Sequence, residues 1–175
     1  VIAVIAILFI GSTAAYFSFK QTAVGQKISS GTTQFLTEAS QSNFSAIRVP
    51  AVDDQGNGIV TTLKVEAMLG KGQALVNIEN LLFFVDTQSS IRTAKSVAEK
   101  ISGVNTSNID LIYSIETDAE VIEGPSAGAA LTIVTVAALQ TKTIQSDVMI
   151  TGTVSADGTI GAIGGVVAKA KAARD

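Results

Sequence analysis

Residues 123–139 read EGPSAGAALTIVTVAAL, and this stretch decides how the rest of the chain is arranged. From Ser126 to Leu139 the segment is apolar on all faces. A helix without a polar stripe has to be buried. We therefore expect a central helix that starts after the Gly124-Pro125 pair and is surrounded by the other elements of the domain.

The segments before this helix alternate in period. Residues 59–69 and 74–85 have strand character and are separated by a glycine turn, so we expect them to form an antiparallel hairpin. Apolar residues at helical spacing predict a helix over residues 88–102. Residues 109–115 again read as a strand. Strands and helices thus surround the central helix, which is typical of an α+β domain with mixed sheets and packed helices.

The segments after the central helix extend the same pattern. We expect a strand over residues 147–155, a turn at Ala156-Asp157-Gly158, and a return strand over residues 159–163. Two glycines then precede a last helix over residues 166–174. The predicted domain runs from residue 46 to residue 175.

The N-terminal part of the chain has a different composition. Residues 1–19 carry no charge, and a helix of that length, at about 1.5 Å per residue, nearly crosses a hydrocarbon core of ~30 Å. We interpret residues 1–19 as a transmembrane anchor or a signal segment, with a buried core helix as the alternative. Residues 20–45 are rich in Ser and Thr and predict a linker. On this reading the domain works outside the cytoplasm, associated with the membrane or secreted.

The overall composition excludes several kinds of chemistry. The formal net charge is −3, which offers no basic surface for nucleic acid. The chain has no Cys and no His, which excludes a Ser-His-Asp triad and sites ligated by thiolate or imidazole. We expect neither a metal nor a cofactor. The chain also lacks the G-x-x-x-x-G-K-[ST] pattern of P-loop ATPases.

Ser126 is the candidate nucleophile. It lies at the predicted start of the buried helix, where free N–H groups and the positive end of the helix dipole favour an oxyanion. Gly124 and Gly128 would let a substrate backbone come close. The alternative is that Ser126 only caps the helix, as serine often does.

The base for such a serine would have to be a lysine. Burial among apolar groups lowers the pKa of a lysine and makes its amine a proton acceptor. Lys169 and Lys171 lie in an Ala-rich segment, and helical periodicity does not choose between them. The alternative is that both are solvated lysines near a helix C-terminus. The Ser-x-x-Lys arrangement of penicillin-binding proteins does not occur in the chain.

Two blocks of the sequence resemble a known family. Glu123-Gly-Pro-Ser-Ala-Gly128 resembles the nucleophile motif of the Lon-type Ser/Lys peptidases. Thr151-Gly152, a hairpin and Ile163-Gly-Gly-x-x-x-Lys169 resemble the second motif of that family. Lys169 lies 43 positions after Ser126, which matches the spacing of the family. The resemblance covers residues 46–175 and is closest to the stand-alone, membrane-linked Lon-like proteins of archaea.

The resemblance implies a fold, a site and an activity. It implies the Lon-type proteolytic fold, with Ser126 as nucleophile, Lys169 as base and Thr151 beside the lysine. Gly124, Ala127 and Gly128 would support the serine, whereas the role of Glu123 is open because many Lon proteases carry Asp there. The family also implies ring-shaped homo-oligomers and a domain that continues past the lysine helix, so that residues 46–175 would be truncated at the C-terminus.

We therefore expect an ATP-independent serine endopeptidase that hydrolyses peptide bonds in protein substrates. An extended substrate would pair with an exposed strand edge, for which residues 74–85 are the candidate. Two alternatives remain. One is a catalytically silent binding or scaffold domain on the same fold, anchored to the membrane. The other is a membrane-anchored structural protein in which Ser126 is only a helix cap and Lys169 is solvated.

Overall fold

The computed structural model describes residues 42–77, 82–83, 85–117, 121–122 and 124–174, which belong to one compact unit starting at Ser42. The predicted anchor at residues 1–19 and most of the predicted linker at 20–45 lie outside the described residues. Within the described part, no helix combines the length and the apolar character needed to cross a membrane.

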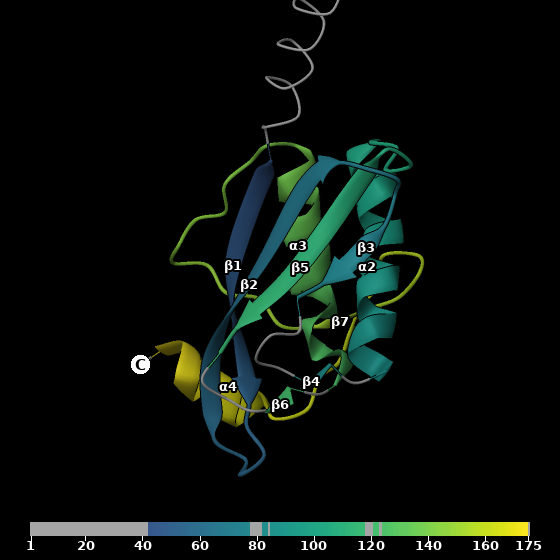
Figure 1. Cartoon of the computed structure of the whole chain (residues 1–175). Coiled ribbons are helices and arrows are strands. Elements are labelled where there is room, and N and C mark those ends of the chain that lie inside the picture. The colour runs from purple at the N-terminus through teal and green to yellow at the C-terminus, as the bar shows by residue number, and fades with distance from the viewer. Residues whose placement is uncertain (1–41, 78–81, 84, 118–120, 123, 175) are drawn as a thin grey trace, which may run out of the picture. The chain divides into compact units, whose positions relative to one another are not determined.

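A four-stranded sheet forms one layer of the domain (Figure 1). Its order is β1 (Asn43–Val52), β2 (Gly58–Leu69), β5 (Ile109–Glu116) and β3 (Ala74–Val76). The pairs β1–β2 and β2–β5 are antiparallel, whereas β3 runs parallel to β5. Strands β1 and β3 are therefore the two edges of this sheet.

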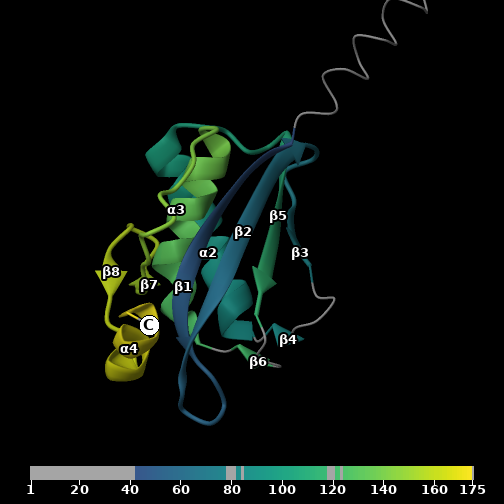
Figure 2. The same ribbon diagram turned by 90° about the vertical axis from the view of Figure 1, so that its left-hand side faces the viewer.

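Two helices, α2 (Val85–Ser102) and α3 (Gly128–Leu139), cover the same face of the sheet (Figure 2). The remaining elements are short and lie toward the end of the sheet at which β1 turns into β2. They are β4 (Leu82–Phe83), β6 (Val121–Ile122), the 3₁₀ turn η1 (Pro125–Ala127), β7 (Thr153–Val154), β8 (Ile160–Gly161) and α4 (Val166–Arg174).

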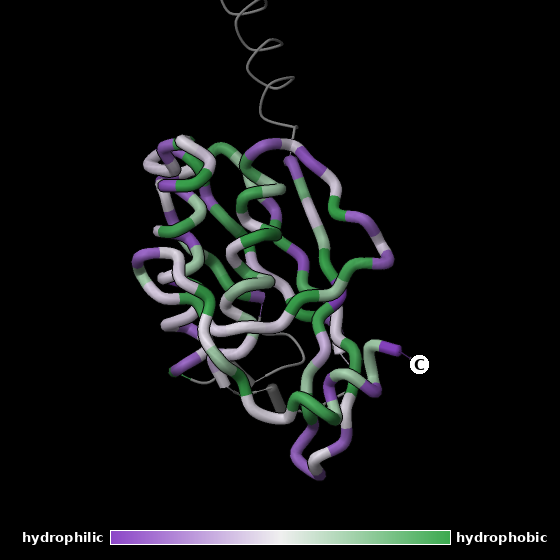
Figure 3. Tube along the Cα trace, turned by 180° about the vertical axis from the view of Figure 1, so that it is seen from behind, coloured by the Kyte–Doolittle hydropathy of each residue, from purple (hydrophilic) through white to green (hydrophobic). Residues whose placement is uncertain are grey.

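The core lies between the sheet and the two helices. Nine of the twelve residues of α3 are buried, which confirms the prediction of a central helix. Leu131 and Val134 of α3 pack with Val65, Leu111 and Tyr113 of the sheet. The hydropathy trace separates this apolar interior from the hydrophilic tip of the hairpin that joins β1 to β2 (Figure 3). The mixed α+β architecture fits the predicted fold class.

The predicted hairpin between residues 59–69 and 74–85 is wrong. The hairpin partner of β2 is β1, and β5 lies between β2 and β3. The reason lies in the turn after β2, where the Asp110 carboxylate accepts the backbone N–H groups of Lys71 and Gln73 at 2.8 Å each. These bonds attach the turn to the start of β5, so the chain passes β5 instead of folding back on β2.

The predicted strand over residues 147–155 is also shorter than expected. Only Thr153–Val154 forms a strand, with one isolated bridge between Met149 and Arg48 upstream of it. The other predicted elements agree more closely with the structure. Strands β2 and β5 and helix α2 lie where they were predicted, with ends that differ by up to three residues, and α4 spans residues 166–174 as predicted.

Candidate active site

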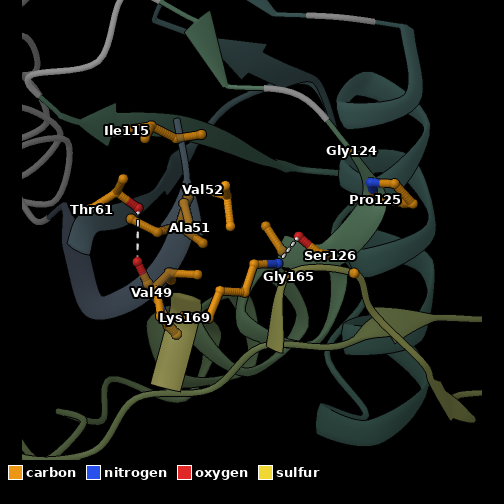
Figure 4. A pocket seen from close by; sticks show the side chains of 14 residues that line it. Val49, Ala51, Val52, Thr61, Ile115, Gly124, Pro125, Ser126, Gly165 and Lys169 are labelled. Atoms are coloured by element: carbon orange, nitrogen blue, oxygen red, sulfur yellow. Dashed lines mark hydrogen bonds between the residues drawn. The ribbon is translucent and has the colours of Figure 1, made fainter. Parts of the chain in front are cut away.

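Ser126 and Lys169 meet in the folded domain. The Lys169 amine donates a hydrogen bond to Ser126 Oγ at a distance of 2.8 Å, although the two residues are 43 positions apart in the chain (Figure 4). The Lys169 residue is only 6% exposed. Lys171, the rival candidate, is exposed on the same helix.

The turn that carries Ser126 is attached to the segment before β7. The Ser126 carbonyl accepts two hydrogen bonds, from the Gly152 N–H at 2.8 Å and from the Thr151 hydroxyl at 3.2 Å. The Ala129 N–H in turn donates to the Gly152 carbonyl at 2.9 Å. Each segment thus donates a backbone hydrogen bond to the other. The backbone at Ser126 is therefore held by residues outside the turn η1 and helix α3.

Helix α4 brings Lys169 to the serine. The Lys169 N–H donates to the Gly165 carbonyl at 2.9 Å, which forms the first turn of the helix. Gly165 has a φ of +68°, a value that an L side chain rarely adopts. A Cβ at this position would also lie 2.7 Å from Val52 Cγ2. The glycine thus lets α4 start close against the end of β1.

An apolar cavity of about 290 Å³ opens beside the two side chains. One wall is the end of the β1–β2 hairpin and the other is the Ser126 turn, with the start of α4 between them (Figure 4). The lining residues are Val49, Pro50, Ala51, Val52, Thr61, Leu63, Ile115, Gly124, Pro125, Ser126, Ala127, Gly164, Gly165 and Lys169. Among the described residues, Lys169 is the one charged side chain that lines it.

The surroundings of Lys169 change its ionisation. Burial lowers the pKa of Lys169 below its ordinary value of 10.5, because an ammonium group loses hydration in an apolar environment. A lowered pKa enlarges the fraction of neutral amine, whose lone pair can accept a proton from a hydroxyl group. The arrangement therefore provides a hydroxyl, a proton acceptor in contact with it, and a cavity beside both.

Comparison with known proteins agrees with this geometry. Residues 55–175 match the model of the Lon protease (S16) C-terminal proteolytic domain. The chain belongs to the Lon protease family. An archaeal Lon protease from Thermoplasma volcanium is 29% identical over 86 residues, which are 49% of this chain and 13% of that protein. The matched segment thus spans a small part of the relative's length.

Three of the predicted supporting residues of this Lon-family domain also lie near Ser126 and Lys169. Gly124 lines the cavity with a φ of +95°, and Ala127 lines it in the turn η1. The Thr151 hydroxyl donates to the Ser126 carbonyl, and Thr151 lines a second, smaller cavity together with Lys169. Glu123 lies outside the described residues.

Gly128, which was expected to let a substrate backbone come close, does not line the cavity. Gly128 is buried, and a Cβ on it would lie 2.8 Å from the Val154 backbone nitrogen. Its small size therefore serves the packing of α3 against β7. The alternative of Ser126 as a helix cap also fails, since α3 begins at Gly128 and no side-chain cap bond forms at its start.

No pattern in the sequence indicates the residues that form the hairpin wall of the cavity. Val49, Val52 and Thr61 carry no catalytic signature and look like ordinary strand residues. The Thr61 hydroxyl donates to the Val49 carbonyl at 3.2 Å, so it is already satisfied within the wall. Strand β3 (Ala74–Val76), which lies in the predicted substrate edge at residues 74–85, does not line this cavity.

Proposed function

We propose that this domain is a serine endopeptidase in which Ser126 and Lys169 form the catalytic dyad. The observation that carries the proposal is the 2.8 Å contact between Lys169 Nζ and Ser126 Oγ, made by a lysine that is 6% exposed. Membership in the Lon protease family supports peptidase activity. The absence of His from the chain leaves lysine as the natural partner for the serine.

The first half of the reaction forms an acyl-enzyme. The neutral Lys169 amine takes the proton of the Ser126 hydroxyl while Oγ attacks the carbonyl carbon of the scissile peptide bond. The negative charge moves to the carbonyl oxygen, which backbone N–H groups near Ser126 stabilise. When the C–N bond breaks, the Lys169 ammonium gives its proton to the departing amine.

The second half releases the product. A water molecule takes the place of the departed amine, and the again neutral Lys169 accepts one of its protons. The resulting hydroxide equivalent attacks the acyl carbon, and the bond to Ser126 Oγ breaks. The proton on Lys169 returns to Oγ, which restores the dyad.

The cavity favours polypeptide substrates with an apolar side chain beside the scissile bond. Val52, Leu63 and Ile115 offer apolar surface, and no acidic side chain among the described residues lines this space. Each apolar side chain buried there contributes about 25 cal/mol per Å². Hydrolysis without ATP, which the resemblance to the stand-alone Lon-like proteins implies, is part of the same proposal.

The setting of the enzyme is part of the same proposal. Residues 1–19 would anchor the domain to a membrane or direct its export, so that it acts outside the cytoplasm. Ring-shaped homo-oligomers would follow from the family. Partition of the full chain into detergent, compared with a chain that starts at Phe44, tests the anchor. Equal partition of both chains would contradict it.

A reactive-serine probe tests the proposed chemistry directly. A fluorophosphonate should label Ser126 in the full chain, faster as pH rises through the lowered pKa of Lys169. Ser126→Ala and Lys169→Met should abolish labelling, whereas Ser155→Ala and Lys171→Met, which change exposed residues, should not. Failure of the folded protein to react at any pH up to 10 would favour a silent binding or scaffold domain.

A further inference from the structure

The position of Lys169 depends on a contact at the far end of the β1–β2 hairpin. The main packing partners of α4 are β2 and β1. The last pair of that hairpin is Val52 with Gly58, and both residues meet α4. Gly165, at the start of α4, lies against Val52, and Ala168 lies against Gly58. We name Val52 and Gly58 the hairpin seat.

Gly58 makes the closest contact in the hairpin seat. A Cβ built on Gly58 would lie 2.1 Å from the Ala168 carbonyl oxygen and 2.7 Å from its carbon, far inside any real contact distance. The obstacle is main chain, so no side-chain rotation could relieve it. Any side chain at position 58 must push α4 away from the sheet, and Ala168 immediately precedes Lys169.

The serine has no part in this contact. Ser126 is held by Gly152 and Thr151 and stands next to α3, which packs on the core. A displacement of α4 at the hairpin seat would therefore move Lys169 without moving Ser126. The 2.8 Å contact between their side chains joins Ser126, whose carbonyl is held by the segment before β7, to Lys169, which lies on α4.

We propose that Gly58 is a positioning residue for the catalytic dyad: its missing side chain lets α4 approach β2 closely enough to place Lys169 in contact with Ser126. The proposal rests on the proposed function, because positioning matters only if the dyad reacts. Gly58 itself touches neither the dyad nor the cavity. Errors of about 1 Å in the placement of a catalytic group cost about 10²-fold in rate.

The ionisation of Lys169 reports its position without requiring activity. Burial alone lowers the pKa of Lys169, and no charged residue of β1, β2 or η1 lines either cavity next to it. Among the described residues, no carboxylate lines these cavities. A change in the pKa of Lys169 would therefore reflect a change in the burial of its amine. If α4 lifts from the hairpin seat, the amine gains water and its pKa rises toward 10.5.

Gly58→Ala in the full chain, with Gly56→Ala as matched control, tests the proposal. Gly56 lies in the same hairpin with a φ of +85°, but no atom is near enough to meet an added Cβ. Both substitutions should lower Tm, the control through backbone strain alone. Only Gly58→Ala should lower kcat, by about 10²-fold. Only Gly58→Ala should also raise the pH midpoint at which the Lys169 amine titrates, followed in NMR spectra through a ¹³C label on Lys169 Cε.

The possible outcomes distinguish a role of Gly58 in positioning Lys169 from a role in stability alone. If Gly58→Ala keeps kcat and the Lys169 midpoint of the unmodified chain, or if Gly56→Ala changes them equally, the proposal is overturned. If Gly58→Ala does not fold, Ala172→Leu decides by the same readouts, because Ala172 Cβ closes the same gap from the helix side at 3.1 Å. If the unmodified chain proves inactive, the proposed function fails, and the Lys169 midpoint still tests the hairpin seat.

Discussion

Ser126 lies in the turn η1 directly before α3, Lys169 lies in α4, and these two helices are supported in opposite ways. Nine of the twelve residues of α3, the helix behind Ser126, are buried, and α3 packs on both the sheet and α2. In α4, Lys169 is the one buried residue among the described positions, and Val167 is 70% exposed. The turn that carries Ser126 thus leads directly into a core helix, whereas Lys169 lies on a peripheral helix.

Because of this difference, we expect α3 to matter mainly for the stability of the domain and α4 mainly for its proposed activity. The core around α3 supplies most of the apolar burial that stabilises the domain, since the free energy gained is roughly proportional to the apolar area removed from water. Helix α4 buries little besides a lysine, which is costly to desolvate. Changes at α4 should therefore affect catalysis much more than folding, and changes under α3 should do the reverse.

The largest expected effect is on catalysis at α4. Lys169→Met should lower kcat/KM by about 10²–10⁴-fold, the usual contribution of a general base, and should leave Tm unchanged or higher. Peptide hydrolysis and thermal unfolding measure the two quantities, with Lys171→Met as the control. Unfolding of the Lys169→Met chain would show that the amine is structural, and the contrast between the helices would break down.

The second effect is on stability at α3. Leu131 is 0% exposed, so Leu131→Ala should lower the free energy of unfolding by about 2–5 kcal/mol. Val167→Ala on α4 should change it by less than about 0.5 kcal/mol, because Val167 is a surface residue. Urea denaturation measures both. Equal losses for the two variants would contradict the assignment of α4 to the periphery.

A third prediction concerns Tyr113 of β5, which packs against α3 and contributes to the stability of the core. Tyr113 donates a hydrogen bond to Thr135 Oγ1 at 3.1 Å, since Thr135 itself donates to the Leu131 carbonyl, and burial raises the pKa of Tyr113 to about 12. Its stabilising contribution is complete below pH 10 and is lost as pH rises toward 12. Tyr113→Phe should cost about 1 kcal/mol at neutral pH and should remove this alkaline loss in denaturation experiments.

The smallest effect is the pH dependence that Lys169 imposes. Its pKa in the folded state lies below its unfolded value of 10.5, so the unfolded state binds more protons between the two values. The free energy of unfolding should therefore rise with pH across that window. The difference between the unmodified chain and Lys169→Met, measured from neutral pH up to 10, should shrink correspondingly. A constant difference would mean that the amine is solvated.

The local sequence pattern predicted where helices and strands lie better than it predicted which strands pair. Helices α2 and α4 and strands β2 and β5 follow from periodicity within about a dozen residues. The pairing of β3 with β5 does not, because it depends on a carboxylate at Asp110 that receives the turn after β2 from more than 35 positions away. Pairing across such distances leaves no trace in the spacing of apolar residues.

The residues of the candidate site likewise fall into those that the sequence predicted and those that it did not. Ser126 and Lys169 stood out because two motifs at a matching distance coincide in a chain without His. The hairpin wall and Gly58 did not, since a valine that lines a cavity has the same local pattern as one that fills a core. The fit of Gly58 against Ala168 is a property of two main chains, and only the folded domain contains it.

The attachment of Lys169 to α4 also sets the order in which the proposed dyad is assembled during synthesis of the chain. A chain on the ribosome emerges from its N-terminus, so the sheet, α2 and α3 become available before residue 166 is made. Such a chain already holds the Ser126 hydroxyl but has no amine to accept its proton. Under the proposed mechanism, the nascent protein cannot cleave itself or its neighbours until α4 has docked on a hairpin that was synthesised about a hundred residues earlier.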